Sequence, residues 1–189
     1  MKNRLGLLLF LIIASCSTQP YREPGSIGLA GESCRSLIHF LIDDVPHARA
    51  KALAFIEEAE QQGLAVHIDV GGEGRYLDAI NINPGRYTST TGEAGRTIPR
   101  HIYGLGQDLP IPDRAVDQLT LENTPLNGPI IEEILRVMRP RGKIRLSHPR
   151  DYADSAHLEL IERLGERVDE VVRTFNPLQD SVESVILLH

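Results

Sequence analysis

The chain has 189 residues, of which 41% are hydrophobic and 24% charged, a composition that fits one globular domain with a sizeable core. Its formal net charge is -6 at pH 7 and no stripe of basic residues is visible, which argues against a general nucleic-acid binder. Aromatic residues make up 5% of the chain and tryptophan is absent, so a platform for stacking bases or sugars is not expected either.

The first residues have the pattern of an export signal. Lys2 and Arg4 form a short basic region, and residues 5–14 are an apolar run. About ten apolar residues are too few to span a bilayer as a helix, but they suit the core of a signal peptide. The run ends in Ile13-Ala14-Ser15-Cys16, which resembles the lipobox of bacterial lipoproteins.

This resemblance implies that residues 1–15 are a lipoprotein signal peptide, cleaved just before a Cys16 that carries the lipid. The partner of the chain is then a membrane, reached through the anchor on Cys16. Ser17 follows Cys16 where Asp would stand in some lipoproteins, which implies an outer-membrane lipoprotein facing the periplasm. An ordinary secretory signal and an uncleaved membrane anchor are the alternatives.

Residues 16–35, rich in Pro and Gly, are expected to be a flexible tether, and residues 36–189 to be the folded domain. Once Cys16 carries a lipid, Cys34 is a lone thiol, so no intramolecular disulfide is expected. No metal site is predicted, because Cys and His residues show no metal-ligand spacing.

The first part of the domain predicts a helix followed by two strands. Residues 45–62 have helical spacing of apolar positions, and Gly63 is a suitable end for that helix. The apolar positions are Ala48, Ala52, Leu53, Phe55, Ile56 and Ala59. Strands are expected at 66–70 and 79–82. Residues 84–100 show no core-facing pattern and predict a long loop, which in a compact domain is usually functional or mobile.

The rest of the domain alternates strands and helices. Strands are predicted at 101–104, 115–121, 143–146, 167–174 and 184–188, and helices at 129–138 and 152–164. The inner face of the first of these helices is formed by Ile130, Ile131, Ile134, Leu135 and Met138. Alternating strands and helices require a largely parallel sheet with helices on its faces. The last two strands leave no room for a crossover helix, so they are expected to be antiparallel.

Three segments carry a resemblance to a known family. They are HIDVGGEG at 67–74, GLGQDLPIPDRAVDQLTLENTPL at 104–126 and EEILRVMRPRGKIRLSHP at 132–149. The first is similar to a strand ending in Asp-x-Gly-x-Gly-x-Gly, and the other two are similar to a Gly-Asp-Ala…Pro-Asp run and a Leu-Lys-Pro-Gly-Gly turn. Together they resemble the class I S-adenosylmethionine-dependent methyltransferases, which implies a Rossmann-like α/β fold with a C-terminal antiparallel hairpin. Another doubly wound α/β domain is the alternative.

The family resemblance implies S-adenosylmethionine as cofactor and assigns residues to it. Asp69 matches the acidic residue that orients the loop and the methionine end of the cofactor. Gly71, Gly72 and Gly74 supply a turn in which backbone N–H groups approach a ligand closely. Asn81 stands where the family commonly has the Asp or Glu that binds the ribose hydroxyls.

Two matches depart from the family pattern. Glu73 adds bulk and charge where the family has an open glycine. Leu105 matches the adenine-contacting Asp but has no polar group, so the resemblance transfers the contact to Gly106, Gln107 or Asp108.

The connection between the first two strands is also short. Only eight residues separate Val70 from Ala79, whereas a parallel crossover normally takes ten or more. The first crossover helix is therefore expected to be missing or shortened to one turn, which removes the helix N-terminus that helps to bind an anionic ligand.

Catalytic candidates lie at two predicted strand ends. Glu122 is a candidate general base and Asn123 a candidate for orienting a nucleophile. The alternative is that both residues cap the strand and the following helix. His148 ends the next strand at the carboxyl edge of the sheet, where ligands bind in such folds, and is a second candidate base.

Three functions follow from these patterns: a methyltransferase using S-adenosylmethionine, a non-catalytic binding module tethered to the envelope, and a secreted effector or toxin-type domain on the same fold. S-adenosylmethionine is a cytosolic metabolite, so a lipoprotein facing the periplasm would meet little of it. The signal sequence favours the binding module or the effector, whereas the three motifs favour the methyltransferase. The sequence therefore predicts an S-adenosylmethionine-dependent methyltransferase-like protein, with the binding module and the effector as the alternatives.

Overall fold

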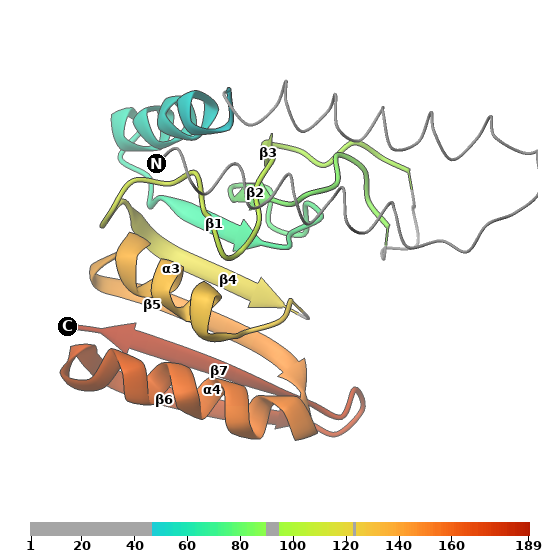
Figure 1. The fold of residues 1–189 in the computed structure, drawn as a ribbon, viewed down its shortest axis with the longest axis vertical. Coiled ribbons are helices and arrows are strands. Elements are labelled where there is room, and N and C mark those ends of the chain that lie inside the picture. The colour runs from blue at the N-terminus through green and yellow to red at the C-terminus, as the bar shows by residue number, and fades with distance from the viewer. Residues whose placement is uncertain (1–46, 90–94, 123) are drawn as a thin grey trace, which may run out of the picture. The chain divides into compact units, whose positions relative to one another are not determined.

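One mixed sheet organises the computed structural model, which describes residues 47–89, 95–122 and 124–189 (Figure 1). Within these residues seven strands lie in the order β3-β2-β1-β4-β5-β7-β6. The strands are β1 His67–Val70, β2 Ile80–Ile82, β3 His101–Ile102, β4 Val116–Glu122, β5 Met138–Pro149, β6 Val168–Asn176 and β7 Ser181–Leu188. Strand β7 is antiparallel to β5 and β6, and the other pairs are parallel.

The predicted fold is confirmed: this is a methyltransferase-like, Rossmann-type α/β fold that ends in an antiparallel hairpin. The helices are α3 Gly128–Val137, α4 Arg150–Leu164, the 3-10 turn Gly165–Arg167 and a helix over residues 47–61. The predicted signal peptide, its cleavage site and the lipidated Cys16 lie outside the described residues and remain predictions. No helix in the described part of the chain is long and apolar enough to cross a membrane.

The helix over 47–61 forms as its pattern predicts. Four of its apolar side chains, Ala48, Ala52, Ile56 and Ala59, are buried in the main core. Leu53, which was placed with them, is 40% exposed. The helix ends before Gly63, which adopts a φ of +65°, a left-handed conformation that glycine reaches without strain.

Helix α3 links the parallel strands β4 and β5. Asn127 caps it by accepting a hydrogen bond from the N–H of Ile130, and its buried residues include Ile131 and Ile134. Met138 was expected on the inner face of this helix, but it is the first residue of β5 and bridges Val116. Strand β5 is therefore much longer than the predicted strand at 143–146.

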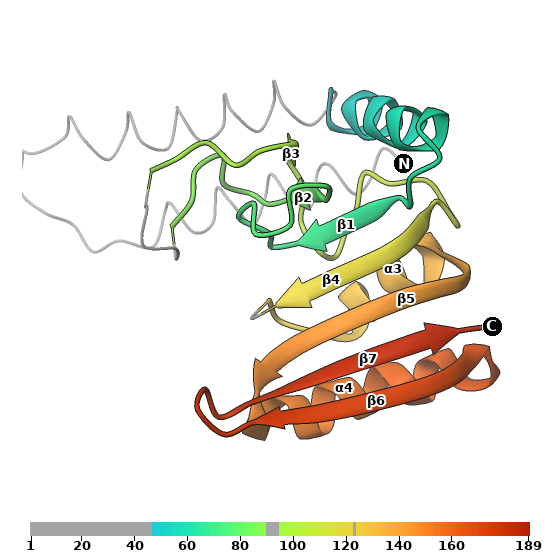
Figure 2. The same cartoon turned by 180° about the vertical axis from the view of Figure 1, so that it is seen from behind.

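The two faces of the sheet differ in cover. Helices α3 and α4 lie on one face, as Figures 1 and 2 show from opposite sides. Strand side chains alternate between faces, so Ile144, Leu146 and His148 point toward the helices, while Lys143 and Arg145 point away. Asp69 pairs with Thr120, and Thr120 pairs with Arg145, so the side chains of these three residues lie on the same face of the sheet.

The β1–β2 connection, residues 71–79, contains no helix, as its length predicts; turns and bends fill it. One expectation about the next segment is wrong. The sequence of residues 84–100 predicts no core-facing side chain, but Ile98 is only 2% exposed. It is held by a bridge between Tyr87 and Thr97, together with backbone hydrogen bonds on either side of that bridge.

Candidate functional site

The candidate site lies where β1, β2 and β4 end. Parallel strands bring their carboxyl ends to one edge of a sheet, and the register pairs Asp69 with Asn81 on one side and with Thr120 on the other. Glu122 ends β4 on the same face, two residues after Thr120. Predicted residues from three separate parts of the chain are therefore brought together here.

Asp69 is a buried acid, only 4% exposed. Its pKa is raised to about 7: burial is the largest cause, the negative charge of Glu122 acts in the same direction, and the positive charge of Arg75 partly offsets both. No hydrogen bond reaches its carboxyl group from the described residues. A buried carboxyl group with a perturbed pKa at the edge of such a sheet is a candidate functional group.

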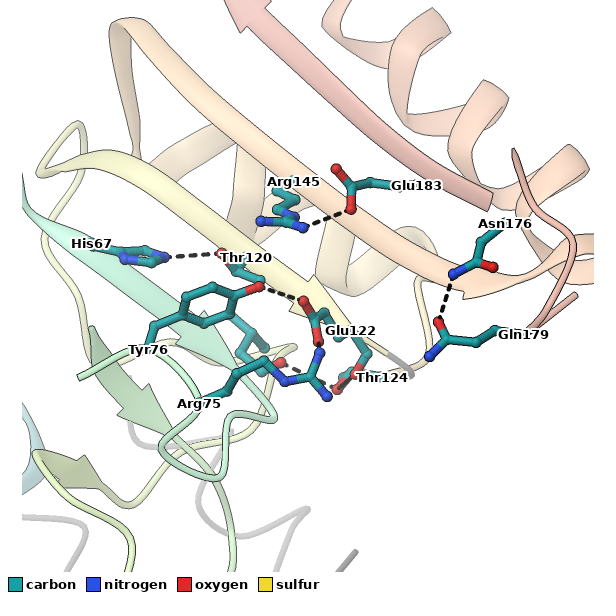
Figure 3. Close-up of polar contacts among 11 residues, drawn as sticks. His67, Arg75, Tyr76, Thr120, Glu122, Thr124, Arg145, Asn176, Gln179 and Glu183 are labelled. Carbon is teal, nitrogen blue, oxygen red and sulfur yellow. Dashed lines mark hydrogen bonds and ion pairs between the residues drawn. The ribbon is translucent and has the colours of Figure 1, made fainter. Parts of the chain in front are cut away.

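Two residues of the β1–β2 connection close over this edge. Arg75 forms an ion pair with Glu122, and the hydroxyl of Tyr76 donates to Oε1 of Glu122 at 2.6 Å (Figure 3). The Tyr76 ring lies 5.3 Å from the ring of His67. Burial and the bond to Glu122 raise the pKa of Tyr76 to about 12, so its hydroxyl remains a donor at neutral pH.

Sequence reasoning missed Arg75 and Tyr76. The only signal was indirect: a connection without a helix has to cover the strand ends with its own side chains. It also missed His67, whose ring bonds the hydroxyl of Thr120 at 2.9 Å beside Tyr76 (Figure 3). Burial lowers the pKa of His67, although the carboxylate of Asp78 acts in the opposite direction.

The glycine turn uses its own backbone donors. The N–H of Gly71 donates to the carbonyl of Ile82 at 2.8 Å, and that of Gly72 donates to the carbonyl of Asp69 at 3.3 Å. The N–H of Gly74 donates to Oδ1 of Asn81 at 3.0 Å. Gly71 and Gly74 have φ values of +78° and +88°, so the turn requires glycine for its own geometry.

The space that the missing side chains leave is also occupied. A Cβ on Gly72 would lie 2.4 Å from Oδ2 of Asp69 and 2.6 Å from Oδ1 of Asn81. A Cβ on Gly71 would meet Thr124, and one on Gly74 would meet Pro99. The space beside these glycines is therefore filled by other side chains of the protein, at the place where the family resemblance implies a ligand.

Asn81 is fully buried, and its amide bonds within the protein. Its Nδ2 donates to the carbonyls of Ala79 at 3.1 Å and Pro99 at 2.8 Å, and its Oδ1 accepts from Gly74. Both amide hydrogens are thus used. The residues as placed do not fit the ribose of S-adenosylmethionine in the way that the family resemblance implies.

The remaining cofactor candidates form a separate turn. Asp108 donates its backbone N–H to the carbonyl of Leu105 at 3.0 Å, and the side chains of Gln107 and Asp108 are exposed. Gly106 packs closely, since a Cβ there would lie 3.1 Å from Ile130 and 3.3 Å from Val70. Its neighbours are therefore core side chains.

His148 lies on the helix-covered face, away from the face of Asp69. Its Nε2 donates to the carbonyl of Thr124 at 2.8 Å, so its Nδ1 accepts from Nε2 of His157, also at 2.8 Å. The hydroxyl of Ser184 then donates to Nδ1 of His157 at 2.8 Å. Both imidazoles are buried and hydrogen-bonded at each nitrogen, an arrangement that ties β5, α4 and β7 together.

Two points about the predicted site remain: the position of Asn123 and the grouping of residues that could bind a metal ion. Asn123 lies outside the described residues. Among residues 47–89, 95–122 and 124–189, no group of three or more His, Cys, Asp or Glu side chains is placed to hold a metal ion.

Comparison with known proteins yields structural likenesses only. No family model matches the chain, and no curated protein matches it. A SAM-dependent methyltransferase from Thermotoga maritima is 13% identical, with 82% of this chain and 99% of that chain covered and a TM-score of 0.48. A SAM-dependent methyltransferase from Aquifex aeolicus is 17% identical, with 81% and 98% covered and a TM-score of 0.43.

A 16S rRNA adenine methyltransferase from Catenulisporales acidiphilia, solved with SAM, is 12% identical, with 77% of this chain and 89% of that chain covered and a TM-score of 0.43. At such identities the likeness concerns the fold alone. What the sheet order establishes is a methyltransferase-like domain.

Proposed function

We propose that this domain is a binding module on a methyltransferase-like fold, in which the former cofactor loop is a structural turn. The observation that carries the proposal is the state of Asn81, which is fully buried with its amide committed to Ala79, Pro99 and Gly74. A residue that binds ribose needs free hydrogen-bonding capacity at a surface that the ligand reaches.

The turn supports the same proposal. The N–H groups of Gly71, Gly72 and Gly74 are all used within the protein, so these three glycines offer no free backbone donor to an anionic or polar ligand. The crossover helix that would add further donors is absent from residues 71–79.

S-adenosylmethionine-dependent methyl transfer is the second candidate, and one observation favours it. The pKa of Asp69 is raised to about 7 beside Glu122, at the edge where these folds bind ligands. Binding there requires residues 71–79 to move away from Glu122, which breaks the contacts of Arg75 and Tyr76.

Calorimetric titration of the full chain with S-adenosylhomocysteine separates the two candidates. The binding module predicts no heat and no thermal stabilisation at millimolar ligand. Micromolar binding that Asp69→Ala abolishes and Asp169→Ala leaves unchanged would overturn the proposal in favour of the methyltransferase. Asp169→Ala is the matched control, because it removes an exposed carboxylate from β6, far along the sheet from the candidate cofactor residues.

We also propose that the module is held at the bacterial envelope through a lipid on Cys16. The support is the sequence alone: the basic start, the apolar run and the Ile-Ala-Ser-Cys motif. Labelling of expressing bacteria with a radioactive fatty acid should mark the wild type and Cys34→Ser but not Cys16→Ser. An unlabelled wild type would contradict the anchor.

A further inference from the structure

A cleft lies between the first turns of helix α4 and the last residues of strand β6. Its volume is about 430 Å³, which falls in the range of pockets that hold small molecules. Helix α4 lies along β7 and β6 (Figure 1). The lining residues are Arg150 and Asp154 of α4, Arg173, Thr174 and Phe175 of β6, and Val182 of β7. We call this space the α4–β6 cleft.

The strand register explains why this lining comes together. Val182 pairs with His148 on one side and with Phe175 on the other, so these side chains share the face of the sheet that the helices cover. Arg173 stands two residues before Phe175 and shares that face. Helix α4 begins at Arg150, directly after β5, so its first turns lie beside the carboxyl end of the parallel strand β6.

Arg150 offers hydrogen-bond donors in this cleft. Its side chain is exposed and forms no hydrogen bond or ion pair with any residue that the structure describes. Its guanidinium lies 5.2 Å from the centre of the Phe175 ring, a cation–π contact that fixes it at the wall of the cleft. The planar fork of arginine can therefore donate two parallel hydrogen bonds to a carboxylate.

The other charges of the lining select a ligand with one negative charge. Arg173 forms an ion pair with Asp154 at 2.9 Å, so these two charges cancel and that of Arg150 remains. A ligand with two negative charges would place the second one near Asp154, which repels it.

The rest of the lining is suited to an apolar group. Val182 is 7% exposed and forms a buried part of the wall, while Phe175 is 46% exposed. Burying an apolar group against these side chains is favourable, and the arginine fixes the orientation of the ligand. We propose that the α4–β6 cleft binds a small organic acid, with its single carboxylate on Arg150 and its apolar group against Phe175 and Val182. No residue of the cleft belongs to the glycine turn, so the proposal is independent of whether S-adenosylmethionine binds.

A nuclear magnetic resonance titration of the ¹⁵N-labelled full chain with phenylpropionate tests the proposal. This probe carries one carboxylate and one apolar ring. The expected result is saturable shifts of the amide signals of Arg150, Phe175 and Val182, with a dissociation constant of about 1 mM, as is usual for so small a ligand. Phenylpropionamide, which has the same shape without the charge, should bind at least ~10-fold more weakly.

Three variants show which charges act on the probe. Arg150→Gln should weaken binding about tenfold, because it removes the charge-assisted hydrogen bonds. Arg163→Gln is the matched control: it makes the same change at an exposed arginine in the last turn of the same helix, and binding should stay as in the wild type. Asp154→Asn should strengthen binding about threefold, because it removes the negative charge of the cleft and releases Arg173. A structural role of these residues would not produce such a gain.

Four outcomes would overturn the proposal. The first is the absence of shifts in the cleft at ten times the expected dissociation constant. The second is equal binding of the acid and its amide, and the third is equal weakening by Arg150→Gln and Arg163→Gln, since either would mean that the Arg150 charge does not hold the ligand. The fourth is binding of a peptide with a C-terminal phenylalanine ten times more tightly than phenylpropionate, which would replace the small acid with a chain terminus.

Discussion

Two buried polar centres stand near the carboxyl ends of strands in this sheet, on opposite faces and with opposite chemistry. At the end of β1, the carboxyl group of Asp69 is buried beside a second acid, Glu122. At the end of β5, His148 and His157 are buried in a chain of hydrogen bonds in which each ring nitrogen has a partner. In the first centre, burial disfavours the ionised form of the Asp69 carboxyl group. In the second, burial favours the neutral form of the two histidines.

The difference follows from what covers each centre. Helix α4 follows β5 and supplies His157, so a regular element provides the partner. The end of β1 is covered by an irregular connection. Around Asp69, Asn81 bonds Gly74 and Pro99, and Glu122 pairs with Arg75. The first centre is thus held by many single contacts and the second by packed secondary structure, a contrast that substitutions can break or sharpen.

The largest effect is expected at Asn81. Asn81→Ala removes a fully buried amide that is the partner of the N–H of Gly74 and of the carbonyls of Ala79 and Pro99; the bond to Ala79 is buried and the other two are partly buried. At one to three kcal/mol for each unmet group, the free energy of unfolding should fall by about 4 kcal/mol. Urea denaturation measures it.

Asn127→Ala is the control from the other half of the fold. It removes a single cap bond from α3 and should cost about 1 kcal/mol. Equal losses at the two asparagines would show that the amide of Asn81 does not hold the turn together.

The sequence predicts the regular half of the fold better than the turn. Apolar runs and helical spacing predict α3 and α4, and the short link between the last two strands predicts that they are antiparallel, because these features follow local pattern. The partner of Asn81, Pro99, lies 18 residues further along the chain, and the partner of His148 lies on a different element. Side-chain bonds across such separations follow from tertiary packing, so the motif at 67–74 predicted the turn but not what fills it.

Asp69→Asn should change the pH dependence of stability. The pKa of Asp69 is about 7 in the folded protein and lies near 3.8 when unfolded, so its contribution is fully present below about pH 3.8 and is lost as the pH rises through 7. Replacing the acid with an amide should therefore stabilise the protein by up to about 4 kcal/mol at pH 8. The gain should vanish near pH 4, which urea unfolding at the two pH values measures.

His157→Gln should act with the opposite sign. Burial and the charges of His148 and Arg173 lower the pKa of His157 to about 4, against 6.5 when unfolded. The free energy of unfolding therefore falls by about 3 kcal/mol as the pH falls from 6.5 to 4, because the unfolded chain takes up the proton at a higher pH than the folded protein does. The free energy of unfolding of the His157→Gln variant should fall correspondingly less between these two pH values. His47→Gln makes the same substitution at an exposed histidine and serves as the variant for comparison.

The smallest expected effect distinguishes the two contacts that close the β1–β2 connection over Glu122. Tyr76→Phe removes a 2.6 Å hydrogen bond to a carboxylate whose side chain is 13% exposed, and should cost about 1 kcal/mol. Arg75→Ala removes an ion pair whose arginine is 65% exposed, and solvent screening should reduce that loss to a few tenths of a kcal/mol.

Hydrogen exchange at residues 71–79 measures the local consequence of these two variants, since opening of this segment exposes its amides without unfolding the sheet. Faster exchange in Tyr76→Phe than in Arg75→Ala would show that the hydrogen bond of the half-buried Tyr76 hydroxyl keeps the connection closed. This hydroxyl keeps its proton at neutral pH, and its ring packs on His67. The reverse order would mean that the surface charge holds the connection down. In that case added salt should speed exchange in residues 71–79, because salt screens an exposed ion pair more strongly than a partly buried hydrogen bond.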